Sequence, residues 1–418
     1  LSSPGASSAN LPFYPLVERF SEAHNSSIMC DVFWTVVSLD RSFLMAAAPS
    51  AEQSKNQSSA EEYFELGVEA LQTGRLDEAI EYLTKAIQLN PDFAEAYNHR
   101  GNAYLRKKEL DRAIQDFNRV IELKPDWTEA YLTRSMAYLQ KRDLEKAFSD
   151  FNEARKLDPN NEKFLLLGGA LYALKREWQS AIDNFTKGVE FLEGTKTSER
   201  LLALFYEIRG ICYFALHVWE NAIADFTKAL EKNAQMTEAY TMRGRVYVLK
   251  KELKKAAADY HKALKLNPNE ADVHLLGGIL YGFKRKLKKA IAECNKAVKL
   301  EPNLREAWLL RGFLYLDTGV WQDAVSDFNK TIELDSKCAE AYFTRAAVYY
   351  SVDALEMALQ DAATLEEIVT ETKDKARLEI LKGKLALAEN KFPEAIQHFQ
   401  KAGALSPTEI ITHLWRIY

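Results

Sequence analysis

Residues 94–127 read AEAYNHRGNAYLRKKELDRAIQDFNRVIELKPDW, and residues 128–161 read TEAYLTRSMAYLQKRDLEKAFSDFNEARKLDPNN. Both stretches place a Tyr, an Arg followed by a small residue, a second Tyr, an Ala, an Asp-Phe pair and a Pro at the same steps. The same phrase returns along most of the chain with a period of 34 residues. A fixed period in the thirties predicts a solenoid, in which each repeat packs on its neighbours.

Each repeat has the pattern of two amphipathic helices joined by a short turn. The small Gly101 in the first helix and Ala113 in the second allow the two helices to approach closely. The aromatic side chains of Tyr104 and Phe117 fill the remaining space. Pro125 ends the second helix, because proline lacks the N–H that a helix needs and disfavours helix in the residue before it.

This spacing resembles the tetratricopeptide repeat (TPR) family. The resemblance implies an all-α fold, a right-handed superhelical solenoid of antiparallel helix pairs. We number the positions of a repeat from 1 to 34, with the small residue of the first helix at position 8. On this numbering ten repeats begin at Ala60, Ala94, Thr128, Glu162, Ala203, Thr237, Ala271, Arg305, Ala339 and Ala376.

The repeats define the expected domain organisation. We expect repeats 1–4 over residues 60–195, repeats 5–9 over 203–372 after a seven-residue insertion, repeat 10 over 376–409 and a partial terminal helix over 410–418. Residues 1–59 are a non-repeat extension, either flexible or wrongly annotated. The second alternative rests on Met45-Ala-Ala-Ala-Pro-Ser, which reads like a translation start.

Composition is typical of an intracellular helical protein. The apolar run from Ile28 to Leu44 is interrupted by Asp31, Asp40 and Arg41, which argues against a membrane span. The four cysteines lie far apart without paired spacing, which favours a reducing, cytoplasmic setting.

No catalytic or metal-binding pattern is present in the sequence. The seven histidines form no pair with Cys or acidic residues at ligand spacing, and no glycine-rich phosphate loop follows a predicted strand. His274 stands at position 4, normally aromatic, and is interpreted as a packed side chain. The sequence predicts a non-enzymatic protein without a cofactor or metal.

The first helices carry the candidate partner groove. In the family that this chain resembles, positions 2, 5, 9 and 12 line a concave surface, and here they are largely apolar. Exposed apolar area of this extent indicates a bound amphipathic or apolar protein segment; alternatively, curvature or the N-terminal segment covers it. The groove residues are Phe64, Val68, Leu71, Asn98, Asn102, Leu132, Met136, Leu139, Ile211, Phe214, Leu275, Ile279, Leu309, Phe313, Leu316, Phe343 and Tyr350.

Two better-known groups of proteins with such repeats have binding-site residues that this sequence lacks. The co-chaperones of the family hold a terminal carboxylate with Asn, Lys and Arg, and here only Asn98 and Asn102 stand at suitable positions, without the cations. The sugar-transferring enzymes with such repeats show a ladder of Asn at position 6, which this chain lacks. We therefore expect no chaperone-tail clamp.

Basic residues recur at the turn inside each repeat and form a second candidate surface. Residues 250–299 contain 13 Lys or Arg against 5 Asp or Glu, a balance of +8 in a chain of net charge −5. This basic edge predicts an acidic protein surface as a partner, ahead of a lipid head group or RNA. The alternative is that these cations only complement helix dipoles and keep the protein soluble. The residues are Lys107, Lys108, Lys141, Arg142, Lys175, Arg176, Lys250, Lys251, Lys254, Lys255, Lys284, Arg285, Lys286, Lys288 and Lys289.

A recurring Arg at position 7 and Asp at position 23, such as Arg243 and Asp259, predict structural ion pairs between helices; the alternative is phosphate recognition. Together these features predict a scaffold or adaptor that binds a protein through an apolar groove and a basic edge. The alternative is a regulatory or targeting arm of a larger enzyme or assembly.

Overall fold

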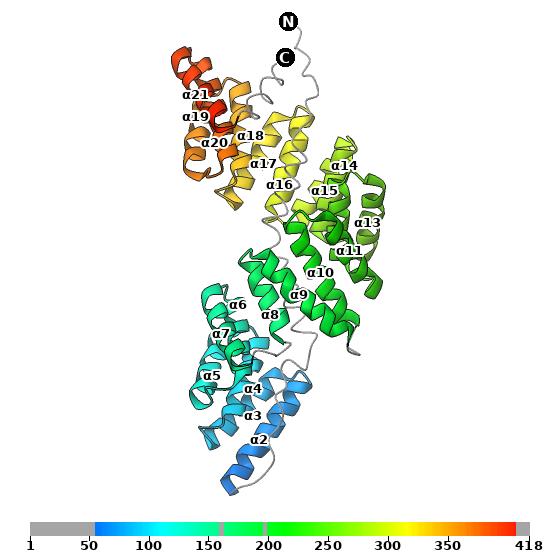
Figure 1. The fold of residues 1–418 in the computed structure, drawn as a ribbon, viewed down its shortest axis with the longest axis vertical. Helices are drawn as coiled ribbons and strands as arrows, with labels where there is room; N and C mark the ends of the chain where they lie inside the picture. Colours follow the sequence, from blue (N-terminus) through cyan, green and yellow to red (C-terminus); the bar gives the residue numbers. More distant parts are fainter. Residues whose placement is uncertain (1–54, 159–162, 195–198, 407–418) are drawn as a thin grey trace. The chain divides into compact units, whose positions relative to one another are not determined.

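A computed structural model of the protein describes residues 55–158, 163–194 and 199–406. Within these ranges the chain is all-α, and its 20 helices follow one another as antiparallel pairs (Figure 1). The predicted all-α solenoid is confirmed. The expectations for residues 1–54 and for the terminal helix over 410–418 concern parts of the chain outside the described residues.

Each repeat contributes two helices. The first helices are α2 (Lys55–Gln72), α4 (Ala94–Arg106), α6 (Thr128–Gln140), α8 (Lys163–Leu174), α10 (Glu199–Ala215), α12 (Thr237–Leu249), α14 (Ala271–Phe283), α16 (Arg305–Asp317), α18 (Ala339–Ser351) and α20 (Thr372–Ala388). The second helices are α3 (Leu76–Leu89), α5 (Leu110–Leu123), α7 (Leu144–Leu157), α9 (Trp178–Glu193), α11 (Trp219–Lys232), α13 (Leu253–Leu266), α15 (Leu287–Leu300), α17 (Trp321–Leu334), α19 (Leu355–Ile368) and α21 (Phe392–Leu405).

The helices fall into two compact units, an N-terminal unit with α2–α11 and a C-terminal unit with α12–α21. Inside each unit, the two helices of a repeat pack on each other, and the second helix also packs on the first helix of the next repeat. First helices of successive repeats touch as well, for example α4 with α6 and α14 with α16. The right-handed sense of the superhelix stays a prediction.

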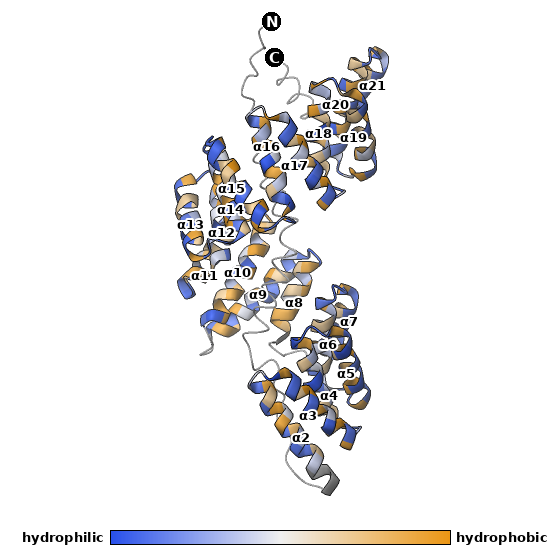
Figure 2. Ribbon diagram, turned by 180° about the vertical axis from the view of Figure 1, so that it is seen from behind, coloured by the Kyte–Doolittle hydropathy of each residue, from blue (hydrophilic) through white to orange (hydrophobic). Residues whose placement is uncertain are grey.

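Close helix packing explains the small residues. A Cβ atom added to Gly101 would lie 2.7 Å from Cε1 of Phe117, and one added to Gly312 would lie 2.7 Å from Cε1 of Phe328. Ala113 on the facing helix is fully buried. The helices also differ in how much apolar surface they carry: α8 is apolar almost all round, whereas the second helices show polar and apolar faces (Figure 2).

The turn inside each repeat has one recurring backbone feature. The residue at position 15 adopts a positive φ, a left-handed conformation that favours glycine. Two repeats place Gly74 and Gly319 there. The other repeats place a residue with a side chain at the same position, at a conformational cost: Lys108, Arg142, Arg176, His217, Lys251, Arg285, Asp353 and Asn390.

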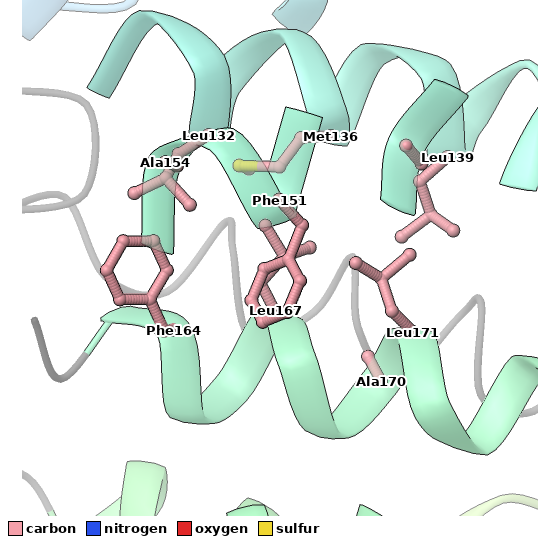
Figure 3. Close-up of a cluster of buried hydrophobic side chains, with 10 residues drawn as sticks. Leu132, Met136, Leu139, Phe151, Ala154, Phe164, Leu167, Ala170 and Leu171 are labelled. Atoms are coloured by element: carbon pink, nitrogen blue, oxygen red, sulfur yellow. The ribbon is translucent and has the colours of Figure 1, made fainter. Parts of the chain in front are cut away.

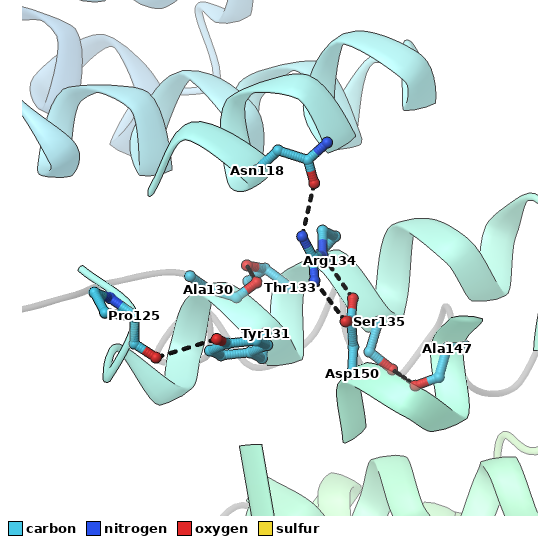
Figure 4. Close-up of polar contacts among 9 residues, drawn as sticks. All are labelled: Asn118, Pro125, Ala130, Tyr131, Thr133, Arg134, Ser135, Ala147 and Asp150. Carbon is cyan, nitrogen blue, oxygen red and sulfur yellow. Dashed lines mark hydrogen bonds and ion pairs between the residues drawn. The ribbon is translucent and has the colours of Figure 1, made fainter. Parts of the chain in front are cut away.

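The predicted ion pairs between positions 7 and 23 are confirmed. Each Arg uses Nε and Nη2 to bind both carboxylate oxygens of the Asp on the second helix of its own repeat, as Arg134 does with Asp150 (Figure 4). The Asp side chains are buried, so these pairs belong to the repeat packing. The pairs are Arg100–Asp116, Arg134–Asp150, Arg209–Asp225, Arg243–Asp259, Arg311–Asp327 and Arg345–Asp361.

Candidate partner-binding surfaces

The predicted groove residues are mostly buried, which corrects the expectation that they form exposed apolar area. Only Val68, Leu316 and Tyr350 among them are half-buried. All the others are buried: Phe64, Leu71, Asn98, Asn102, Leu132, Met136, Leu139, Ile211, Phe214, Leu275, Ile279, Leu309, Phe313 and Phe343.

Packing between repeats accounts for this burial. On α6, Leu132, Met136 and Leu139 belong to one apolar cluster with Phe164, Leu167 and Leu171 of α8, the first helix of the next repeat (Figure 3). Phe151 of α7 fills the same cluster. Positions 5, 9 and 12 of one repeat therefore meet the next first helix in this part of the solenoid. Such side chains stabilise the array and offer little apolar surface to a partner.

Asn98 and Asn102 are the polar members of the predicted groove. They lie one turn apart on α4, and each is 3% exposed. The Oδ1 atom of each amide is buried and accepts no hydrogen bond in the described part of the chain. An unpaired buried acceptor costs about 1–3 kcal/mol, so this pair has hydrogen-bonding capacity that the fold does not use.

In the N-terminal unit, the lysine at position 14 of the basic edge binds an acidic residue at position 18 of the preceding repeat. Lys107 Nζ lies 2.6 Å from Asp77, and Lys141 Nζ lies 2.5 Å from Asp111. Lys175 lies 3.9 Å from Glu145 and over the ring of Phe148. These contacts pair successive turns with one another. In this unit, the basic edge is therefore largely neutralised by the repeat next to it.

The C-terminal unit breaks this pattern. Position 18 holds Lys254 in repeat 6 and Lys288 in repeat 7, where repeats 1–3 hold acids. Carboxylates on this edge include Glu252, which binds Lys255 at 2.6 Å and lies 3.6 Å from Lys250, and Asp317, which binds Arg285 at 3.0 Å. Six lysines form no ion pair with a carboxylate in the described ranges, and we call them the lysine patch: Lys251, Lys254, Lys284, Lys286, Lys288 and Lys289.

Electrostatics at the lysine patch agree with an excess of positive charge. Partial burial lowers the pKa of Lys284, and the like charge of Lys286 lowers it further. Lys289 stands over the ring of Tyr281, with its Nζ 5.9 Å from the ring centroid. An anionic partner would relieve this repulsion. Two other predicted basic-edge residues, Lys108 and Arg142, are exposed at the turns of α4–α5 and α6–α7.

A buried polar cluster lies close to the lysine patch in sequence. Nδ1 of His274 lies 2.7 Å from Glu293, and Nε2 lies 2.9 Å from the backbone oxygen of Pro268. Tyr260 and Lys296 also donate to Glu293, at 3.0 and 2.9 Å. Burial opposes the charge of Glu293, but these three side-chain hydrogen bonds outweigh it and lower its pKa to about 2. His274 thus packs inside the repeat, where Tyr131 and Trp308 make the equivalent contact to a Pro oxygen in other repeats.

These features define an all-α solenoid repeat protein. Models of the tetratricopeptide repeat match residues 42–126, 128–161, 237–270 and 271–304. The chain therefore contains tetratricopeptide repeats. Comparison with curated proteins finds no match. None of the helices in the described ranges combines the length and the apolar composition that a membrane crossing requires.

Solved structures similar to this chain include a tetratricopeptide repeat protein from Parabacteroides merdae, at 19% identity and a TM-score of 0.49, covering 61% of this chain and 99% of that one. PilF of Pseudomonas aeruginosa shows 20% identity and a TM-score of 0.46, with 50% and 95% coverage. Yeast Tom70 shows 17% identity and a TM-score of 0.40, with 87% and 95% coverage.

Proposed function

We propose that this protein is a non-enzymatic scaffold or adaptor in the cytoplasm that holds a protein partner with an acidic surface. Tetratricopeptide repeats generally serve protein–protein interaction, and the family assignment supports this class of function. The observation that carries the finer proposal is the lysine patch, six cations without a carboxylate partner on one edge of α12–α15. Cations without partners on an ordered edge attract an acidic surface and speed its association.

The contrast between the two units strengthens this assignment. If the turn lysines served only solubility, they would need no particular pairing. Instead Lys107 and Lys141 are matched by acids of the neighbouring repeat, whereas Lys254 and Lys288 replace those acids. The lysine patch therefore departs from the pairing that the same chain shows between repeats 1 and 4.

Binding of fluorescently labelled poly-L-glutamate, followed by anisotropy, tests the proposal. The wild-type chain is expected to bind, and the affinity should fall steeply with salt, because exposed charges are screened over about 8 Å at physiological ionic strength. Lys254→Glu/Lys288→Glu should weaken binding strongly. Lys262→Glu/Lys265→Glu makes the same change in net charge further along α13 and should weaken it much less. Equal loss in both variants would reject a specific acidic-partner site.

The groove on α4 is a second, smaller element of the proposal. The Oδ1 atoms of Asn98 and Asn102 have no partner in the described residues but are buried, so an extended or amphipathic segment would donate N–H groups to them only after a local opening around α4. Capture of cell proteins on the immobilised chain, eluted by rising salt, separates the two surfaces. Partners that leave at low salt and fail to bind Lys254→Glu/Lys288→Glu use the lysine patch. Partners that survive high salt and depend on Asn102 use the groove.

The rival function, a regulatory or targeting arm of a larger enzyme or assembly, would use the same surfaces. Co-purification of an enzymatic activity with the wild-type chain, absent from the lysine-patch variant, would favour it.

A further inference from the structure

Beyond the lysine patch, the edge formed by the turns inside the repeats exposes apolar and acidic side chains in place of lysines. In repeats 8 and 9 this edge exposes large apolar side chains. Val352 and Met357 stand at positions 14 and 19, which hold cations in other repeats, whereas Trp321 stands at position 17, which is apolar in every repeat. Trp321 is 47% exposed, Val352 55% and Met357 49%. At the position equivalent to Trp321, Trp219 of repeat 5 is half-buried, with its ring 5.5 Å from that of Phe214. Exposed aromatic and aliphatic side chains together mark an interaction surface.

Acidic side chains lie within two residues of these apolar side chains in the sequence. Asp323, Asp353 and Glu356 are exposed, and none of the three has an ion pair with a cation in the described ranges. We call Trp321, Val352 and Met357 with these three acids the acidic edge. A surface of this composition fits a partner that offers cations beside an apolar contact, and it would repel an anionic lipid surface.

The lysine patch and the acidic edge follow one another along the same unit. Arg285 in the turn of repeat 7 binds Asp317 at the end of α16 in repeat 8, at 3.0 Å, so the turns of these two repeats are neighbours. The order along the edge is lysines in repeats 6 and 7, Trp321 in repeat 8, and acids in repeats 8 and 9. If a second copy of the chain is turned end to end along this edge, its acids face the lysines of the first copy and its lysines face the acids of the first copy.

We propose that the acidic partner of the lysine patch is a second copy of this chain, so that the protein forms a two-fold symmetric dimer. The dimer axis passes near Trp321, and the lysine patch of each copy contacts the acidic edge of the other. Two-fold interfaces are isologous, so one complementary pair of patches is used twice. An aromatic residue at the centre with charges around it is the usual arrangement of a binding hot spot. This inference rests on the proposed function and names its partner.

Sedimentation velocity of the full chain across a concentration series tests the dimer. The wild type is expected to dimerise at low salt and to dissociate as salt rises. Lys254→Glu/Lys288→Glu and Asp353→Lys/Glu356→Lys should each be monomeric, because like charges then face each other. An equimolar mixture of the two variants should dimerise again, since both contacts in the mixed pair are complementary. Trp321→Ala should weaken the wild-type dimer on the order of tenfold.

The outcomes separate the inference from the proposed function. Lys262→Glu/Lys265→Glu controls for net charge and should stay dimeric. A wild-type chain that is monomeric at every concentration yet binds poly-L-glutamate through the lysine patch overturns the dimer and keeps the proposed function. A dimer that both charge-reversal variants retain also overturns it. A mixture that stays monomeric rejects the pairing of lysine patch with acidic edge.

Discussion

Arg134 and Asp150 form a bidentate ion pair that joins the two helices of repeat 3, with Nε to Oδ2 and Nη2 to Oδ1 both at 2.7 Å (Figure 4). The third nitrogen, Nη1, donates to Oδ1 of Asn118 on the second helix of the preceding repeat, also at 2.7 Å. One side chain therefore ties three helices together. Burial raises the pKa of Asp150, and the hydrogen bonds and charge of Arg134 oppose that shift.

Replacing this arginine should destabilise the repeat strongly. Arg134→Leu leaves the buried Asp150 without its cation, which costs about 3–5 kcal/mol. The double variant Arg134→Leu/Asp150→Leu removes both charges and should recover most of that loss. Urea denaturation of the three proteins measures the effect. If the single and double variants lose the same stability, the unpaired carboxylate is not the cause.

The left-handed position in the turns offers a stabilising change. Arg142 is exposed at φ 59°, so Arg142→Gly should relieve strain and raise stability by about 0.5–1 kcal/mol. Gly319 at φ 76° gives the opposite control, because Gly319→Ala introduces the same strain where no atom would meet the new Cβ within 4 Å. Thermal unfolding should move upward for the first variant and downward for the second. A fall in both would show that Arg142 makes a contact worth more than the strain.

His99 should make the N-terminal unit sensitive to mild acid. Burial lowers the pKa of His99 from 6.5 to about 4, although Glu95 and Glu129 act in the opposite direction. His99 is therefore protonated in the unfolded state at pH values where it stays neutral in the folded state. The free energy of unfolding falls as pH drops from about 6.5 towards 4. Between pH 7 and 5 the loss from this group is about 2 kcal/mol. Urea denaturation at both values should show a smaller pH effect for His99→Leu than for the wild type.

Glu293 should protect the C-terminal unit in a different pH range. Its pKa is lowered to about 2, so its stabilising contribution is complete above the ordinary value of 4.5 and is lost as pH falls towards 2. Glu293→Gln removes the charge that His274 and Lys296 share, and should cost about 2–3 kcal/mol at pH 7. At about pH 2 and below, the free energies of unfolding of the variant and the wild type should converge. A constant difference across this range would mean that packing, and not charge, sets the cost.

Much of the fold follows from the 34-residue period. Helices α4 and α6 begin at Ala94 and Thr128, one period apart. The pairing of Arg134 with Asp150 was predictable too, because both residues recur at fixed positions on facing helices. The neutralisation of Lys107 by Asp77 was missed, although position 18 of each repeat carries the signal. The acidic edge was missed because its free charge depends on the next repeat: Glu356 stands at position 18 as Asp77 does, but position 14 of the next repeat holds Glu389 and not a lysine.

The sequence by itself determined the local order of this protein: the helix pairs, the small residues between them and the Arg–Asp pairs, because these depend on residues within one or two repeats. Only the tertiary structure decided which side chains remain free. Leu132 and Met136 are buried because first helices of successive repeats pack side by side. The sequence pattern within one repeat does not determine how closely the next first helix approaches. The free charge of the C-terminal unit is likewise decided across repeats, where Lys254 and Lys288 replace the acids that neutralise such an edge elsewhere.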